Sequence, residues 1–209
     1  NIQTGCTYTP GNNITTFNGT GSQTFTNSGT ITSGLYDFTV NKSAGMLTLA
    51  GTLATTTVRN NLSITAGTIA DGGKTIDVKG NVVNAGTHSG AGNITLSSTT
   101  LQTITSANGV FGNLIFNNTI AAGLTSVALV GNTTINGNLT LNQNNLFNIS
   151  SFNRSALVIH SNGIIASCCT TSSLKASNHL WLTVKTSSTN HSASAPKSFF
   201  KWIILNMLF

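Results

Sequence analysis

Residues 102–118 read QTITSANGVFGNLIFNN, and residues 23–41 read QTFTNSGTITSGLYDFTVN, which is the same pattern with different filler. Aligning the two stretches places Gln23 on Gln102 and Asn41 on Asn117. Further along, VRNNLSIT at 58–65 aligns with INGNLTLN at 135–142. A unit of about 77 residues therefore occurs nearly twice. Such a repeat is typical of architectures that lengthen by adding similar sections.

Short apolar runs alternate with polar residues through this region and are followed by Gly, Asn or Ser. A period of two predicts strands, and the residues that follow supply the conformations needed at corners. The runs are LTLAG (47–51), LSITAG (62–67), IDVKGN (76–81), ITLSS (94–98), LIFNN (114–118) and LTLNQN (139–144). The apolar residues predicted to form the core are Leu62, Ile64, Ile76, Val78, Ile94, Leu96, Leu114, Phe116, Leu139 and Leu141.

Two all-β architectures suit strands of this length and spacing. One is a parallel β-solenoid, whose stacked coils bury an apolar column, and the other is an antiparallel β-sandwich. A solenoid accepts a duplication of about 77 residues by growing longer, whereas a closed sandwich needs a second domain. The repeat therefore favours the solenoid, in which each copy is expected to build the same section of the stack.

The composition changes near residue 150 and divides the chain into a repetitive region, 1–150, and a basic tail, 151–209. The whole chain carries nine Lys and Arg, three acidic residues and a formal charge of +6. Region 1–150 is nearly neutral and has no basic stripe interleaved with aromatic residues, so nucleic-acid binding is not expected there. The tail is interpreted as a separate module, a poorly ordered extension or an out-of-frame reading.

Neither end of the sequence has a recognisable targeting or membrane-spanning segment. The apolar run in Phe199–Phe209 is too short for a span of about 20 residues. Because the chain begins at Asn1 with neither a Met nor a signal-peptide core, we expect either a processed product or a fragment of a longer protein. The truncated second repeat favours a fragment.

The repetitive region resembles a known group of bacterial proteins. The segments that carry the likeness are NLSITAGTI (61–69), IDVKGNVVNAGTHSGAGNITLSSTTLQTITSANGVFGNLIFNN (76–118) and INGNLTLN (135–142). Together they resemble the repetitive extracellular and cell-surface proteins of Bacteroidetes-type bacteria, which have β-helix-like repeats, over about residues 20–150. The resemblance implies secretion or surface display and an adhesive or structural role, and it supplies no shared catalytic motif.

The acidic residues are too few for the usual chemistry of β-helical polysaccharide hydrolases and lyases. Such enzymes need paired carboxylates, or Asp-bound calcium beside a basic residue. Here Asp71 and Asp77 lie within DGGKTID (71–77), and Asp37 is isolated. We interpret Asp71 as a turn former and the other two as solvated strand residues. No second copy of this segment exists, so a tandem calcium ladder is not expected.

Other reactive residues also lack a productive arrangement. His88 and Ser89 could be base and nucleophile, but neighbours on a strand point to opposite faces and no third residue is identified to orient His88, so a loop is predicted. The three cysteines form no disulfide framework, and the tail's ligand types match no zinc spacing. These residues are Cys6, Cys168, Cys169, His160, His179 and His191.

The many threonines raise the possibility of an ice-binding surface. That function needs Thr side chains in rank on successive coils. Because no common interval separates them, we interpret them as solvated strand positions; the residues are Thr95, Thr103, Thr105, Thr133 and Thr140.

The sequence therefore predicts a non-enzymatic, secreted or surface-displayed solenoid with a structural or adhesive role, whose partners are surface glycans or other cell-surface components. It predicts no catalytic residue, cofactor or metal. A carbohydrate-binding or carbohydrate-active β-helix is the alternative, and an ice-binding protein is the third hypothesis.

Overall fold

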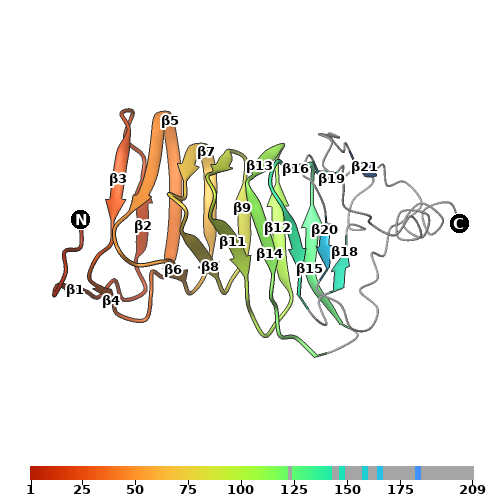
Figure 1. Ribbon diagram of the computed structural model, residues 1–209, viewed down its shortest axis with the longest axis horizontal. Helices are drawn as coiled ribbons and strands as arrows, with labels where there is room; N and C mark the ends of the chain where they lie inside the picture. The colour runs from red at the N-terminus through yellow and green to blue at the C-terminus, as the bar shows by residue number, and fades with distance from the viewer. Residues whose placement is uncertain (122–123, 143–145, 149–156, 160–163, 167–181, 185–209) are drawn as a thin grey trace, which may run out of the picture.

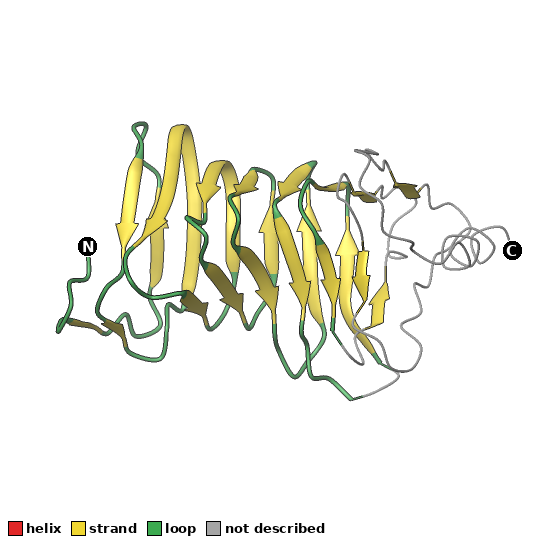
Figure 2. Ribbon diagram, in the orientation of Figure 1, coloured by secondary structure: helices red, strands yellow, loops and turns green. Residues whose placement is uncertain are grey.

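The chain folds as a parallel β-solenoid, which confirms the predicted architecture. The computed structural model describes residues 1–121, 124–142, 146–148, 157–159, 164–166 and 182–184. These residues form strands and loops without a helix (Figure 2). Every strand pairing among them is parallel, and the coils stack along the long axis of the molecule (Figure 1).

The strands form three faces, which we number in the order that the chain visits them. Face 1 contains β2 (Ile14–Phe17), the first half of β5 (Asp37–Ala50), the first half of β7 (Leu62–Ala70), β9 (Val82–Asn84), β12 (Gln102–Ser106), β15 (Thr125–Val130) and β18 (Leu146–Asn148). Face 2 contains β3 (Gln23–Thr26), the second halves of β5 and β7, β10 (Thr87–Ser89), β13 (Gly109–Phe111), β16 (Thr133–Ile135), β19 (Leu157–Ile159) and β21 (Leu182–Val184).

Face 3 is a separate six-stranded sheet. It contains β6 (Thr55–Val58), β8 (Thr75–Val78), β11 (Asn93–Leu96), β14 (Asn113–Phe116), β17 (Leu139–Leu141) and β20 (Ile164–Ala166). Two short strands, β1 (Thr7–Tyr8) and β4 (Thr30–Ile31), pair near the N-terminal end.

The alternation seen in the sequence places one set of side chains inside the coils. In β11, for example, Ile94 and Leu96 are buried whereas Asn93 and Thr95 are half-buried on the outside. All ten residues predicted to form the core are buried, at no more than 4% exposure. Burial of this apolar column is the main favourable contribution to folding.

The long strands β5 and β7 bend between face 1 and face 2. The bend in β7 contains Gly67 at φ +78°, a conformation that glycine adopts more readily than other residues. A Cβ atom at this position would lie 2.6 Å from the carbonyl oxygen of Lys42 in the preceding coil. The bend therefore requires glycine for both its backbone conformation and its close packing.

Side-chain oxygens of Asp and Asn continue the hydrogen bonding at the corner that leads into face 1. Oδ1 of Asp37 accepts from the backbone N–H of Asn61 at 2.9 Å. Oδ1 of Asn61 accepts from Asn81 N–H at 2.9 Å, and Oδ1 of Asn81 accepts from Thr103 N–H at 2.8 Å. Each bond joins one coil to the next, which accounts for part of the high asparagine content.

The two copies of the sequence repeat do not build the same section of the solenoid, so that expectation was wrong. Leu62 lies on face 1, whereas its aligned partner Leu139 lies on face 3. Phe25 lies on face 2, and its partner Ile104 lies on face 1. Each residue of the second copy thus lies one face away from its aligned partner in the first copy. Such a shift is possible because the three faces share the same alternation of strand and corner.

What the copies share is the structure of a corner. The Gln23 side-chain oxygen accepts from Gly19 N–H at 3.3 Å and from Lys42 Nζ at 2.9 Å. In the second copy, the Gln102 oxygen accepts from Ser98 N–H at 2.9 Å and from Asn118 Nδ2 at 3.1 Å. Lys42 and Asn118 are aligned in the repeat, and both are buried.

Strands β19, β20 and β21 continue the pairing beyond residue 150. The other residues of 151–209 lie outside the described part of the chain, so the proposed boundary and the three interpretations of the tail remain predictions. No helix among the described residues has the length and apolar character needed to cross a membrane.

Candidate functional site

The most regular polar surface of the described chain is the outside of face 3. Three outward positions recur on five successive coils, two residues apart along each strand and opposite one another between coils. All are half-buried or exposed. We call this set the outer grid: Thr55, Thr57 and Arg59; Thr75, Asp77 and Lys79; Asn93, Thr95 and Ser97; Asn113, Ile115 and Asn117; and Asn138, Thr140 and Asn142.

The outer grid is more polar than the outside of the other two faces. Ile115 is its one apolar member. In contrast, face 2 exposes Met46 and presents Val110, and face 1 exposes Val83 and presents Val130. With about 4.8 Å between strands and about 6.7 Å between alternate residues, the grid covers about 19 by 13 Å.

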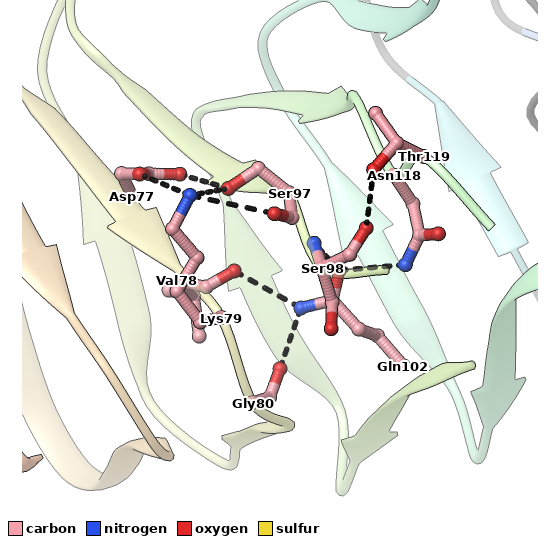
Figure 3. Close-up of polar contacts among 9 residues, drawn as sticks. All are labelled: Asp77, Val78, Lys79, Gly80, Ser97, Ser98, Gln102, Asn118 and Thr119. Atoms are coloured by element: carbon pink, nitrogen blue, oxygen red, sulfur yellow. Dashed lines mark hydrogen bonds and ion pairs between the residues drawn. The ribbon is translucent and has the colours of Figure 1, made fainter. Parts of the chain in front are cut away.

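A charged cluster lies on the second and third coils of the outer grid (Figure 3). Lys79 Nζ lies 3.0 Å from Asp77 Oδ2 and donates to Ser97 Oγ at 2.9 Å, and Ser97 Oγ donates to Asp77 Oδ1. The side chains of Lys79 and Asp77 are 43% and 19% exposed. Exposed ion pairs of this kind contribute about 0–1 kcal/mol to stability. The cluster's main effect is to fix the three polar groups in position and to neutralise two charges.

The first coil of the outer grid ends in a second cation. The Arg59 guanidinium carbon lies 5.4 Å from the centre of the Tyr36 ring, and Arg59 Nη2 donates to the carbonyl oxygen of Gly11. Tyr36 is half-buried. A guanidinium at this distance from a ring is attracted to its face. Arg59 is therefore held against the protein at the edge of face 3.

Asp71 and His88 form a second pair, which is buried. Asp71 directly follows β7, and His88 lies on β10, which pairs with the end of β7 on face 2. His88 Nε2 lies 3.0 Å from Asp71 Oδ2, and neither side chain is exposed. Asp71 Oδ1 accepts from the backbone N–H groups of Gly73 and Gly92 at 2.7 and 2.9 Å. His88 Nδ1 accepts from the N–H of Gly112 at 3.2 Å. This network assigns the imidazole proton to Nε2, so His88 donates to the carboxylate.

The environment of Asp71 favours its ionised form. Burial raises the pKa of its carboxyl group, but the hydrogen bonds from His88, Gly92 and Gly73, together with the electrostatic interaction with His88, outweigh that effect. The pKa of Asp71 therefore lies below its ordinary value of 3.8. Since both imidazole nitrogens of His88 are engaged and its side chain is fully buried, the pair is structural.

The structure corrects the loop predicted at His88 and Ser89 and refines the interpretations of the three aspartates. Asp71 does accept a hydrogen bond in the turn that follows it, but it is also buried against His88. His88 and Ser89 lie on strand β10, and Asp71 is the orienting residue that the sequence did not reveal. Asp37 and Asp77 are half-buried strand residues with hydrogen-bond partners.

The threonines interpreted as solvated strand positions occupy several environments, and the interpretation was wrong for Thr133, which is buried. Thr95 and Thr140 belong to the same row of the outer grid, Thr103 and Thr105 lie on face 1, and Thr133 is buried. Asp77 and Ile115 interrupt the row that contains Thr95. Face 3 therefore carries an interrupted row of threonines, which the intervals in the sequence did not reveal.

Cys6 is an exposed free thiol. No three His, Cys, Asp or Glu side chains gather as a metal site in the part of the chain that the structure describes. His160, Cys168, Cys169, His179 and His191 lie outside the described residues.

Comparison with protein-family models gives no match to this chain, and comparisons with curated proteins and with solved structures give none either.

Proposed function

We propose that this chain is a non-enzymatic solenoid segment of a secreted or surface-displayed protein, where it acts as a structural and adhesive element. The outer grid is the observation that carries this proposal. It offers polar side chains at 14 of its 15 positions, in register over five coils. A surface of this kind suits many weak, repeated contacts.

The buried polar groups support a structural role as well. Asp71 with His88, and Lys42 with its carbonyl partners, use their hydrogen-bonding capacity inside the protein. Such networks stabilise one arrangement of the coils. Surface glycans are the partners that we propose for the adhesive role, and the resemblance to repetitive bacterial surface proteins supports the proposed location.

Bead adhesion and polysaccharide turnover test this function together. Beads coated with the chain should be retained on immobilised bacterial surface material more than albumin-coated beads, and the chain should release no reducing sugar from that material. Retention equal to albumin would refute the adhesive role. Sugar release that disappears in the Asp77→Asn variant would refute the absence of enzymatic activity.

A further inference from the structure

We propose that the outer grid of face 3 binds a linear, uncharged glycan that lies across successive coils. This inference rests on the adhesive function proposed above and assigns it a ligand class and a surface. The argument uses the unused hydrogen-bonding groups of the grid, its charge and its shape.

Several side chains on the second and third coils of the outer grid have no partner in the described part of the chain. Thr75, Asn93 and Thr95 are half-buried, and no hydrogen bond joins their side chains to other described residues. A threonine hydroxyl donates and accepts, and an asparagine amide provides two donors and an acceptor. Sugar hydroxyl groups likewise donate and accept, so each can pair with either side chain.

The short side chains of the grid favour binding at low entropic cost. Threonine is β-branched and has few χ1 rotamers, and the parallel sheet fixes the backbone beneath it. Little side-chain freedom is therefore lost when Thr75 and Thr95 form hydrogen bonds with a ligand, compared with flexible Lys or Gln side chains.

The charge of the outer grid favours an uncharged ligand over an anionic polymer. Asp77 neutralises Lys79 across 3.0 Å, and Arg59 is held against Tyr36. A surface that binds nucleic acid or another polyanion needs several unpaired cations, and its affinity falls steeply with salt. The grid lacks that excess of positive charge. Its ion pair instead presents fixed donors and acceptors to hydroxyl groups.

The shape of the grid selects an extended chain. The polar positions recur at about 4.8 Å along the solenoid axis, and the outer surface of one sheet follows all five coils. A polymer that lies along this axis meets similar groups on each coil. Its individual contacts are weak, but their effective concentration is high, so the whole chain is retained.

Binding to insoluble or immobilised neutral polysaccharides tests the proposal. The panel consists of a β-glucan, an α-glucan, a mannan and an N-acetylglucosamine polymer. The bound fraction is measured over a range of protein concentrations at about 0.05 and about 0.5 M salt, because charge screening differs strongly between these two concentrations. Two triple variants are compared with the parent chain. The first changes face 3 as Thr75→Ala, Asn93→Ala and Thr95→Ala.

The matched control changes three half-buried threonines on face 2, as Thr68→Ala, Thr87→Ala and Thr134→Ala. These side chains also make no hydrogen bond with other described residues, so the two variants should keep similar thermal stability. At least one polysaccharide should bind equally at both salt concentrations. The face 3 variant should bind about tenfold more weakly or worse, while the face 2 variant binds as the parent does.

Three results would overturn the inference. Equal loss in both variants, or loss in the face 2 variant alone, would remove the site from the outer grid. Binding that disappears at the higher salt would show that charged groups, and not the uncharged side chains of the outer grid, carry the interaction. If the chain binds none of the neutral polysaccharides, the proposed ligand class is rejected. This holds even if the chain shows thermal hysteresis, which would indicate ice binding. Bead adhesion that persists in any of these cases would leave the proposed adhesive function standing.

Discussion

Replacing Asp71 with Ala should destabilise the protein strongly, because this carboxylate accepts three hydrogen bonds in a fully buried position. The donors are Gly73 N–H, Gly92 N–H and His88 Nε2, at 2.7, 2.9 and 3.0 Å. A buried donor left without an acceptor costs about 1–3 kcal/mol, and this change leaves three such donors. We expect Asp71→Ala to lower the free energy of unfolding by at least about 3 kcal/mol, since three buried donors lose their acceptor.

Two further variants separate the contributions to this loss. Asp71→Asn keeps Oδ1 for Gly73 and Gly92 and loses the carboxylate that faces His88, so it should cost about 1–3 kcal/mol. Asp77→Ala is the matched control, since that carboxylate is only half-buried and pairs with the exposed Lys79, and it should cost less than about 1 kcal/mol.

The assay is urea unfolding at pH 7, followed by circular dichroism, with the slope m compared among the variants. A shared slope allows the differences in midpoint to be converted to differences in stability. Combining Asp71→Ala with His88→Ala should cost less than the sum of the single variants, because the second change removes a donor that the first has already left unpaired. If Asp71→Ala proved no more destabilising than Asp77→Ala, the structural role assigned to the buried pair would be refuted.

Three other predictions use the same unfolding assay. The folded-state pKa of Asp71 lies below its ordinary value of 3.8. The stabilisation by this carboxylate is therefore complete above that value and is lost as pH falls through the folded-state pKa. The parent should lose more stability than Asp71→Asn between about pH 5 and 2, and parallel curves for the two proteins would count against this. Lys42 Nζ donates to Gly19 O, Gly21 O and Gln23 Oε1, so Lys42→Met should lower the free energy of unfolding by at least about 2 kcal/mol. Lys42→Asn should cost less, because it introduces the residue that Asn118 provides at the equivalent corner. A greater loss for Lys42→Asn than for Lys42→Met would contradict the shared corner. Ile94→Ala should lower the free energy of unfolding by about 2–5 kcal/mol because Ile94 is buried. Thr95→Ala should lower it by less than about 1 kcal/mol because Thr95 points outward. Similar losses for the two variants would refute the register of β11.

The sequence predicted the core and the class of fold well because both depend on local alternation. A strand such as Ile94–Thr95–Leu96 shows its inward residues directly, and the turn residues on either side mark its ends. These signals are present within a few residues and do not require knowledge of which strands are neighbours.

The rows on the outside depend on neighbouring coils, and the coils differ in length. Thr57, Asp77, Thr95, Ile115 and Thr140 lie in one row although 20, 18, 20 and 25 residues separate them. A search for a constant interval therefore missed the outer grid. A search that anchored each coil on its inward apolar pair, two positions apart, could have aligned these residues.

The buried Asp71–His88 pair was missed for a related reason. The two residues are 17 positions apart, and the interaction forms because the end of β7 pairs with β10 in the next coil. Gly90 adds a requirement that is also invisible in the sequence, since a Cβ atom there would lie 2.2 Å from Asp71 Oδ1. The sequence supplied the residue types but not the contact.

The most direct test of the central claim is to map the bound ligand on the protein by nuclear magnetic resonance. An oligosaccharide prepared from the polysaccharide that binds best is titrated into labelled protein, and chemical-shift changes are followed for threonine methyl and asparagine amide groups. We predict that the largest changes occur at Thr57, Thr75, Asn93, Thr95 and Thr140 on face 3, while Thr68, Thr87 and Thr134 on face 2 do not change. Changes centred on face 2, or spread equally over both faces, would contradict the assignment of the outer grid as the binding surface.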